Sequence, residues 1–306
     1  MYKFNKILVG LDNSTMDSQL IKAACAVCRF SGTTDIYFTN VVREFDYPQS
    51  LLDEFPDIIE RALAERKAQI EQSVKENFVC SDVKIHYIID QGKPTRFLMK
   101  RINDLKIDLL VLGRKNEKEG GGIIINRLAR RASCSLLVIP KNAHLNFSKI
   151  WVPSDFSSYS KMALEKAVRI AKKIETKPSI TIQNVFQVPS GYHYTGKSFD
   201  EFAEIMKENA HKDFLTFSSS INFEGIDHKI TYTLDKDEDV IASIVKAAKK
   251  AKADLIIIGA KGRNATTAIF IGSSAEKMIQ MDSNIPMLVV RPKGKTAGLV
   301  EYLKDL

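Results

Sequence analysis

Residues 254–263 read Asp-Leu-Ile-Ile-Ile-Gly-Ala-Lys-Gly-Arg, and residues 272–277 read Gly-Ser-Ser-Ala-Glu-Lys. The apolar run has no alternating polar residues, which indicates a strand buried on both faces of a parallel sheet. Glycines follow at Gly259, Gly262 and Gly272, and the sequence then turns helical. A strand, a glycine loop and a helix start together predict an anion site. Glycines let the backbone approach a ligand, and the first N–H groups of a helix point at it.

A plain strand-to-helix turn would also use glycine, so the spacing has to decide between the two interpretations. Gly-x2-Gly-x9-Gly-Ser, over residues 259–273, is more specific than a glycine pair and favours phosphate binding. Ser273 and Ser274 could add hydroxyl donors. The loop does not end in Gly-Lys-Ser/Thr as a Walker A sequence does, and it lacks the Gly-x-Gly-x-x-Gly spacing of a dinucleotide site.

The same order of elements occurs twice in the 306 residues. Residues 106–113, KIDLLVLG, repeat as residues 252–259, KADLIIIG, at an offset of 146, and Asp12 corresponds to Asp155 at an offset of 143. Self-similarity over this length indicates duplication. Strands that alternate with helices predict parallel sheets with right-handed crossovers. We therefore expect an α/β fold of two tandem, doubly wound, parallel five-stranded sheets of Rossmann-like type.

The domain boundary is expected where the first pattern ends. We expect domains at residues 1–142 and 148–294, followed by a C-terminal tail at 295–306. The connection is too short for a flexible tether, so the two halves are expected to pair within the chain. Residues 49–77 are expected to form a long, charged helical region. The apolar closing strand at 287–290 would need a partner at its edge, either the other half or a second chain in a homodimer.

Ligands of doubly wound sheets bind at the carboxyl ends of the strands. Asp155, Val185 and the loop that starts at Gly259 all fall at such ends. The Asp155 carboxylate could accept hydrogen bonds from a ribose or an adenine edge, and Pro153 and Val185 could form walls for the base. Asp155 could instead only cap the helix that follows it.

At Gly259, Gly262, Gly272 and Ser273 the sequence resembles the nucleotide motif of the ATP-binding branch of the universal stress proteins. The resemblance covers nearly the whole chain, because the pattern occurs twice. It implies an adenine nucleotide alpha hydrolase-like fold. It also implies ATP, ADP or AMP as the cofactor, with Mg²⁺ as an optional companion. By position, it implies an adenosine pocket made of Pro153, Asp155, Val185, Gly259, Gly262, Arg263, Gly272, Ser273 and Ser274.

The corresponding loop of the first half departs from that motif. Gly113 matches Gly259, but Asn116 stands where the second glycine would be. The offset between the halves grows from 146 residues before the loop to 151 after it, so the loop is five residues shorter. Glu117 and Glu119 would repel a phosphate. We therefore expect the first half to bind no triphosphate tightly, and to pack against the second half or to hold a different ligand.

The overall composition is that of a globular protein, with 44% hydrophobic and 27% charged residues and a net charge of +8. Positive charge could favour an anionic ligand, a membrane surface or nucleic acid. The lysines mostly sit on expected helix faces without interleaved aromatic residues, so neither nucleic acid nor a membrane is expected as a partner. Residues 1–6 lead directly into a strand and lack the apolar segment of a signal peptide, which predicts a cytoplasmic protein.

No set of catalytic or metal-ligating residues is visible in the sequence. Cys25-x2-Cys28 has no second cysteine pair or nearby histidine to complete a zinc site. Phosphoryl transfer usually needs a metal-holding carboxylate and a positioned base, and Asp155 alone does not supply both. The leading hypothesis is a tandem universal-stress-type protein that binds ATP in its C-terminal half without strong catalysis. The alternatives are an adenylyl-transferring or slow ATP-hydrolysing enzyme and a scaffold that needs no nucleotide.

Overall fold

The computed structural model describes residues 3–115, 123–143, 145–262, 271–281 and 283–292. The chain forms two compact units, divided between Lys141 and Asn142. The tail expected at residues 295–306 lies outside the described residues.

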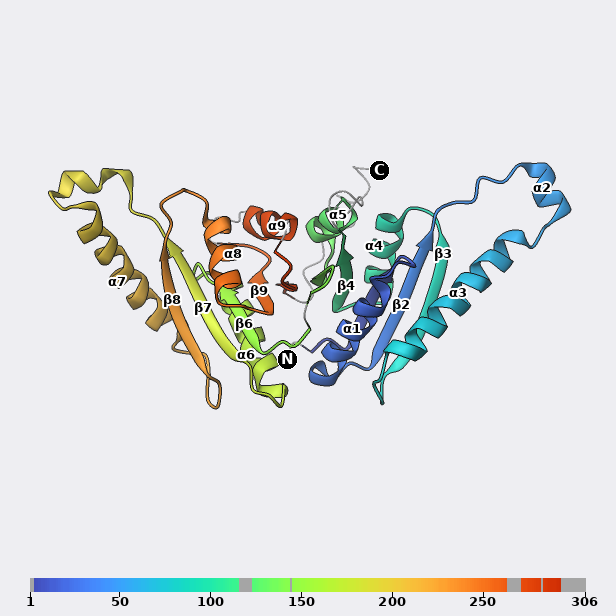
Figure 1. Ribbon diagram of the computed structural model, residues 1–306, viewed down its shortest axis with the longest axis horizontal. Coiled ribbons are helices and arrows are strands. Elements are labelled where there is room, and N and C mark those ends of the chain that lie inside the picture. Colours follow the sequence, from blue (N-terminus) through green and yellow to red (C-terminus); the bar gives the residue numbers. More distant parts are fainter. Residues whose placement is uncertain (1–2, 116–122, 144, 263–270, 282, 293–306) are drawn as a thin grey trace. The chain divides into compact units, whose positions relative to one another are not determined.

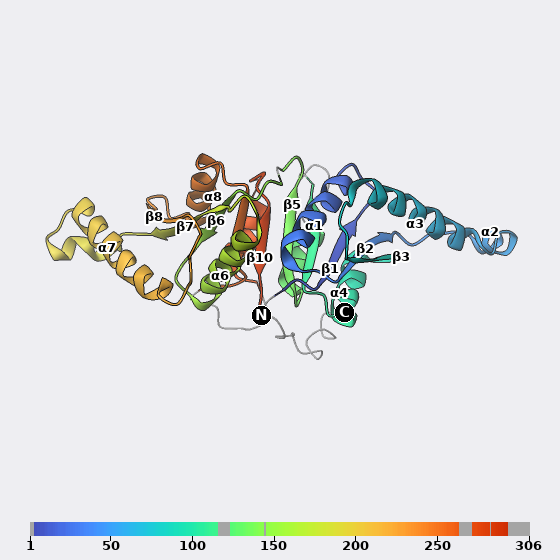
Figure 2. The same cartoon turned by 90° about the horizontal axis from the view of Figure 1, so that it is seen from below.

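The first unit is a parallel sheet with helices on both faces (Figures 1 and 2). Its strands are β1 (Lys6–Leu11), β2 (Asp35–Val42), β3 (Lys84–Gln91), β4 (Leu109–Arg114) and β5 (Ser135–Pro140). They pair in the order β3-β2-β1-β4-β5. Its helices are α1 (Asp17–Ser31), α2 (Gln49–Glu54), α3 (Ile58–Asn77), α4 (Pro94–Asp104) and α5 (Ile123–Arg131). Helix α1 packs beside α3 and α4 beside α5.

The second unit repeats this arrangement. Its strands are β6 (Lys149–Pro153), β7 (Ser179–Phe186), β8 (His228–Leu234), β9 (Leu255–Gly259) and β10 (Met287–Val290). They pair in the order β8-β7-β6-β9-β10, again all parallel. Its helices are α6 (Ser158–Lys173), α7 (Phe199–Ser218), α8 (Val240–Lys250) and α9 (Ser273–Gln280), with a 3₁₀ helix, η2 (Ser190–Thr195). The predicted duplication and the two parallel five-stranded sheets are confirmed.

The central strands are buried because helices cover both faces of each sheet. Ile7, Leu8 and Val9 of β1 are completely inaccessible, and every residue of β9 is buried. This burial explains why these strands read as continuous apolar runs rather than as alternating patterns. Among the helices whose residues are described, none combines the length and the apolar character needed to cross a bilayer.

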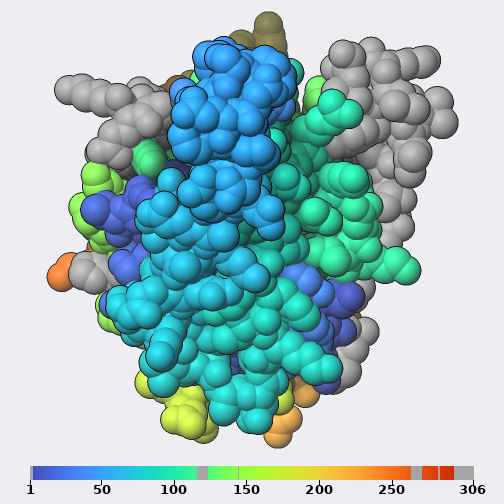
Figure 3. Space-filling model, turned by 90° about the vertical axis from the view of Figure 1, so that its right-hand side faces the viewer, coloured from blue at the N-terminus to red at the C-terminus, as the bar shows by residue number. Residues whose placement is uncertain are grey.

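The long helical region expected at residues 49–77 is interrupted in the structure. Helix α2 ends at Glu54 and α3 begins at Ile58. Pro56 lies in the break; it has no N–H to donate to a helix, and it disfavours helical geometry at Phe55. No residue of α2 is buried. In Figure 1, α2 lies beyond the sheet next to the start of α3, and Figure 3 shows this segment at the surface of the molecule.

Candidate functional site

A cavity of about 340 Å³ lies at the carboxyl ends of β6, β7 and β9 in the second unit. These ends come together because β6 lies between β7 and β9 at the switch in strand order. Most of the predicted site residues line this one cavity: Pro153, Asp155, Val185, Gly259, Gly262, Gly272 and Ser274. Ser273 is the first residue of α9 and is not part of the lining. Arg263 lies outside the described residues.

Gly259 is required by helix packing. A Cβ atom at this position would lie 2.6 Å from the backbone oxygen of Tyr159 in α6. Backbone atoms cannot move aside as a flexible side chain can, so only glycine lets α6 approach β9 this closely. The first glycine of the motif therefore serves the fold of the unit and ends the strand at the edge of the cavity.

The other two described glycines shape the loop itself. A Cβ at Gly262 would lie 2.9 Å from the Oδ2 atom of Asp155, and one at Gly272 would lie 3.3 Å from the Cα of Lys261. The N–H of Gly272 donates to the carbonyl of Ala260 at 2.7 Å, which closes the loop at the start of α9. Side chains at these positions would displace the Asp155 carboxylate or open the loop.

Asp155 is positioned by the turn before α6. Its Oδ1 atom accepts a hydrogen bond from the N–H of Ser157 at 3.1 Å, and Phe156 takes a left-handed conformation, with φ of 63°. The N-cap of α6 is Ser157, whose hydroxyl accepts from the N–H of Ser160 at 3.3 Å. The side chain of Asp155 thus stabilises the turn, while its Oδ2 atom lies beside Gly262.

Sequence reasoning missed Asn184, a buried residue that also lines the cavity. Its Nδ2 donates to the carbonyl of Ser154 at 2.9 Å and fixes the end of β6. In the first unit, Asn40 donates in the same way to Leu11 at 2.9 Å. The signal was available in the sequence, because an asparagine precedes a valine near the end of the second strand in both halves.

Lys261 was also missed. It lines the cavity between Gly259 and Gly262, is only 7% exposed, and places its Nζ 6.0 Å from the centre of the Tyr159 ring. A cation at that distance is attracted to the face of an aromatic ring. Lys115 holds the same position in the first half, which is the sequence signal that could have pointed to it.

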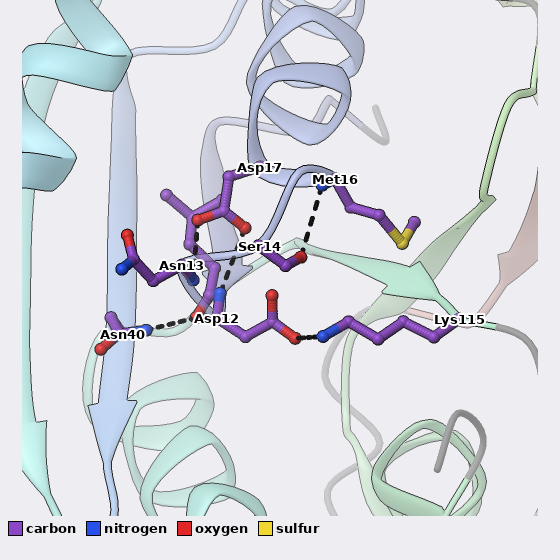
Figure 4. Close-up of polar contacts among 8 residues, drawn as sticks. Asp12, Asn13, Ser14, Met16, Asp17, Asn40 and Lys115 are labelled. Atoms are coloured by element: carbon purple, nitrogen blue, oxygen red, sulfur yellow. Dashed lines mark hydrogen bonds and ion pairs between the residues drawn. The ribbon is translucent and has the colours of Figure 1, made fainter. Parts of the chain in front are cut away.

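The corresponding edge of the first unit has a cavity of about 160 Å³. At its rim the Lys115 ammonium forms an ion pair with the Asp12 carboxylate (Figure 4). The buried Asp17 accepts hydrogen bonds from the backbone N–H groups of Asp12, at 3.2 Å, and Asn13, at 2.9 Å. Residues 116–122, where the sequence departs from the glycine motif, lie outside the described residues.

Burial dominates the electrostatics of Asp17. It raises the pKa of this carboxyl from 3.8 to about 6, although the backbone N–H groups of Asp12 and Asn13 favour the charged form. The neighbouring charge of Asp12 raises the pKa further. In the second unit the corresponding residue is Ser160, which carries no charge.

Within the described ranges, no three His, Cys, Asp or Glu side chains are grouped so that they could hold a metal ion. Cys25 and Cys28 are buried on α1, and burial raises the pKa of the Cys28 thiol to about 11, which keeps it protonated near neutral pH.

The model of the universal stress protein family matches this chain twice, at residues 3–140 and 146–291. A universal stress protein of Methanocaldococcus jannaschii is 30% identical over 163 residues, which cover 48% of this chain and 96% of the relative. A second one from the same organism is 31% identical over 159 residues, covering 51% of this chain and 89% of the relative.

Solved structures share the fold over the whole chain. A universal stress protein from Archaeoglobus fulgidus has a TM-score of 0.61 at 19% identity, covering 96% of this chain and 98% of its own. A functionally unknown protein from Pseudomonas aeruginosa has a TM-score of 0.67 at 14% identity, covering 99% and 98%. At these identities the likeness concerns the fold alone. The two family matches, together with the duplicated sheets, show that this chain belongs to the universal stress protein family and carries two of its domains in tandem.

Proposed function

We propose that the second unit binds an adenine nucleotide, with ATP as the favoured ligand. One observation carries the proposal: the Asp155 carboxylate, the start of α9, and Gly259 and Gly262 border a single cavity. At both glycines an added Cβ atom would lie less than 3.0 Å from another atom. Its volume of about 340 Å³ falls in the range of small-molecule pockets. A plain strand-to-helix turn would not need the carboxylate and the glycines to meet.

The phosphates would lie at the start of α9. Gly272 is the N-cap of this helix and supplies no side-chain acceptor. The first N–H groups of a helix have no partners within it, and the helix dipole attracts an anion. Ser274 would add a hydroxyl donor, and Lys261 would add a positive charge at the wall of the cavity. Ser273 and Arg263 stay predicted phosphate contacts.

The adenosine would occupy the rest of the cavity. Asp155 would accept hydrogen bonds from the ribose hydroxyl groups, since a carboxylate is an acceptor only. Pro153 and Val185 would contact the base, with Ile244 of α8 adding apolar surface. A Mg²⁺ ion, where it accompanies the nucleotide, would be held mainly by the phosphates, as is usual for this ion.

The proposed role is binding without strong catalysis. A protein that binds ATP more tightly than AMP would respond to the energy state of the cell, which suits a stress or energy sensor. Association of two chains through the closing strand stays a prediction, which light scattering would test. The enzymatic alternative makes a different prediction, namely release of phosphate or AMP from ATP in the presence of Mg²⁺.

Calorimetric titration of the full chain with ATP, ADP and AMP tests this proposal. Gly262→Val should weaken ATP binding at least about a hundredfold, because the side chain would collide with Asp155 at 2.9 Å from the Cβ. Asp155→Asn should weaken it about tenfold through the ribose contacts. Asp12→Asn, at the corresponding position of the first unit, is the matched control and should leave ATP binding unchanged.

Several outcomes would count against the proposal. ATP at saturating concentration should raise the melting temperature, because a ligand that binds only the folded state stabilises it. A wild-type protein that ATP does not stabilise would favour the scaffold alternative. Full-strength ATP binding by the Gly262→Val variant would place the nucleotide elsewhere. Sustained turnover with Mg²⁺ would replace pure binding with catalysis.

A further inference from the structure

The first unit has a cavity that the proposed nucleotide function does not use. It lies at the carboxyl ends of β1, β2 and β4 and has a volume of about 160 Å³. The described residues of its lining are mainly apolar and include Met16, Leu20, Leu98, Leu112, Ile124 and Ile125. An engineered apolar cavity of about 150 Å³ in another protein stays dry and binds benzene. The size and the walls therefore suit one six-membered ring.

The space left by Gly10 is taken by an apolar side chain. A Cβ at Gly10 would lie 2.6 Å from the Cδ2 atom of Leu112, so Leu112 lies directly over this residue. Gly10 corresponds to Pro153, which lines the larger cavity of the second unit. The cavity of the first unit is thus less than half as large, 160 against 340 Å³, and is too small for a nucleotide.

Two charged side chains, Asp12 and Lys115, also line this cavity and form an ion pair with each other (Figure 4). Asp17 holds the turn at Asp12 in place by accepting hydrogen bonds from its backbone, and Asn40 fixes the end of β1. Asp12 is therefore held in a fixed position. The Lys115 side chain, which is 29% exposed, extends to it across the opening of the cavity.

Among the described residues that line the cavity, Asp12 and Lys115 are the only charged ones, and their charges sum to zero, which selects against charged ligands. A charged ligand would lose hydration on entry and would be attracted by one member of the pair and repelled by the other. A hydroxyl group both donates and accepts hydrogen bonds, so it can donate to the carboxylate and accept from the ammonium. The chemistry of the rim therefore favours a neutral hydroxyl group.

We propose that the first unit binds a small, neutral, hydroxyl-bearing ring compound of the phenol class. The ring lies among the apolar side chains, and the hydroxyl group bridges Asp12 and Lys115. This inference does not depend on nucleotide binding by the second unit, so either proposal can fail alone.

Methyl NMR of the full chain, labelled at Met, Leu and Ile, tests the proposal with phenol as the probe. Phenol should shift the methyl signals of Met16, Leu112 and Ile125 in a saturable way. Anisole, which has the ring but no O–H donor, should bind roughly tenfold more weakly. Benzoate and benzylammonium, which carry opposite charges at neutral pH, should both bind more weakly than phenol.

Neighbouring residues on α5 provide a matched pair of variants. Ile124 lines the cavity, whereas Ile123 is 63% exposed and is not part of the lining. Ile124→Trp should fill the cavity and weaken phenol binding at least about tenfold, and Ile123→Trp should not change it. Val41→Phe is a second way to fill the cavity from β2. Unchanged methyl signals from Ile7, Leu8 and Ile36, which are buried in the first unit but do not line the cavity, would show that this unit still folds in the variants.

Three results would overturn the proposal. They are the absence of a saturable shift with phenol, unchanged binding in both cavity-filling variants, and charged analogues or anisole that bind as tightly as phenol. The first two would remove the site, and the third would remove the role of the ion pair.

Discussion

The two units place the same charged residues at the same edge of their sheets, but the residues around them differ. Asp12 corresponds to Asp155 and Lys115 to Lys261. In the first unit the lysine pairs with the aspartate across a small apolar cavity. In the second, the lysine is buried near the ring of Tyr159, and Gly262 leaves room for the aspartate beside the loop. In both proposals the surrounding glycines and apolar residues, and not the charges alone, set the expected ligand.

Both units share a structural frame around these residues, which consists of an asparagine hydrogen bond to the first strand and a glycine packed against the first helix. Asn40 and Asn184 make the same hydrogen bond to the end of the first strand of their unit. Both units also place a glycine, Gly113 or Gly259, against the first helix. This frame positions a carboxylate at the switch in strand order in both units.

The largest expected effect is the difference in the free energy of unfolding between alanine variants of these two glycines. Gly259→Ala puts a Cβ 2.6 Å from the backbone oxygen of Tyr159 and should lower the free energy of unfolding by about 3 kcal/mol or more. Gly113→Ala meets the flexible end of Met16 at 2.9 Å, so it should cost about 1 kcal/mol. Urea unfolding measures both, and the fluorescence of Trp151, the single tryptophan, reports the second unit. Equal costs would mean that the two helices pack equally closely.

The next effect is the pH dependence that Asp17 gives the first unit, at a position where the second unit has the uncharged Ser160. The pKa of Asp17 is raised from 3.8 to about 6, so the folded state binds this proton more tightly than the unfolded chain. The stabilising contribution is therefore complete below pH 3.8 and is lost as the pH rises through 6. It amounts to about 2–3 kcal/mol at most.

Asp17→Asn tests this difference because it removes the ionisation. The free energy of unfolding of the first unit, measured by urea titration between pH 4 and 7, should depend less on pH in this variant. Ser160→Ala, at the corresponding position of the second unit, should leave the pH dependence unchanged. A wild-type stability that rises from pH 4 to pH 6 through Asp17 would contradict the assignment.

The shared asparagines should give equal and intermediate effects. Asn40→Ala and Asn184→Ala each leave a buried carbonyl without its donor, which should cost about 2 kcal/mol. Amide hydrogen exchange at the end of β1 and of β6 would locate the loss in the expected unit. A large loss in one unit and none in the other would show that the two frames have diverged.

The smallest effect concerns the start of the first helix in each unit. Ser157 caps α6, so Ser157→Ala should lower the free energy of unfolding by about 1 kcal/mol. Ser14 is not the N-cap of α1, whose N-cap is Met16, without a side-chain hydrogen bond. Ser14→Ala should therefore change stability by less than about 0.5 kcal/mol. Thermal unfolding of the two variants gives the comparison, which an equal loss would contradict.

The sequence alone predicted the duplication, the parallel sheets and seven of the residues that line the larger cavity. These features are readable because they are local or periodic: Leu255–Gly259 is apolar throughout, and the glycines keep a fixed spacing. A strand that ends in glycine at the switch in strand order also predicts which edge binds a ligand. The break at Pro56 was readable in the same local way, but the surrounding helical pattern obscured it.

Only the tertiary structure decided which distant residues meet. It brought Lys115 to Asp12 and Asn184 to Ser154. It also showed that the close approach of Tyr159, in α6, requires a glycine at position 259. Such contacts depend on how neighbouring strands and helices pack, and no local pattern records that packing. The physical reason is that side-chain periodicity fixes which face of an element is buried, whereas the partner on that face is set by the order of strands in the sheet.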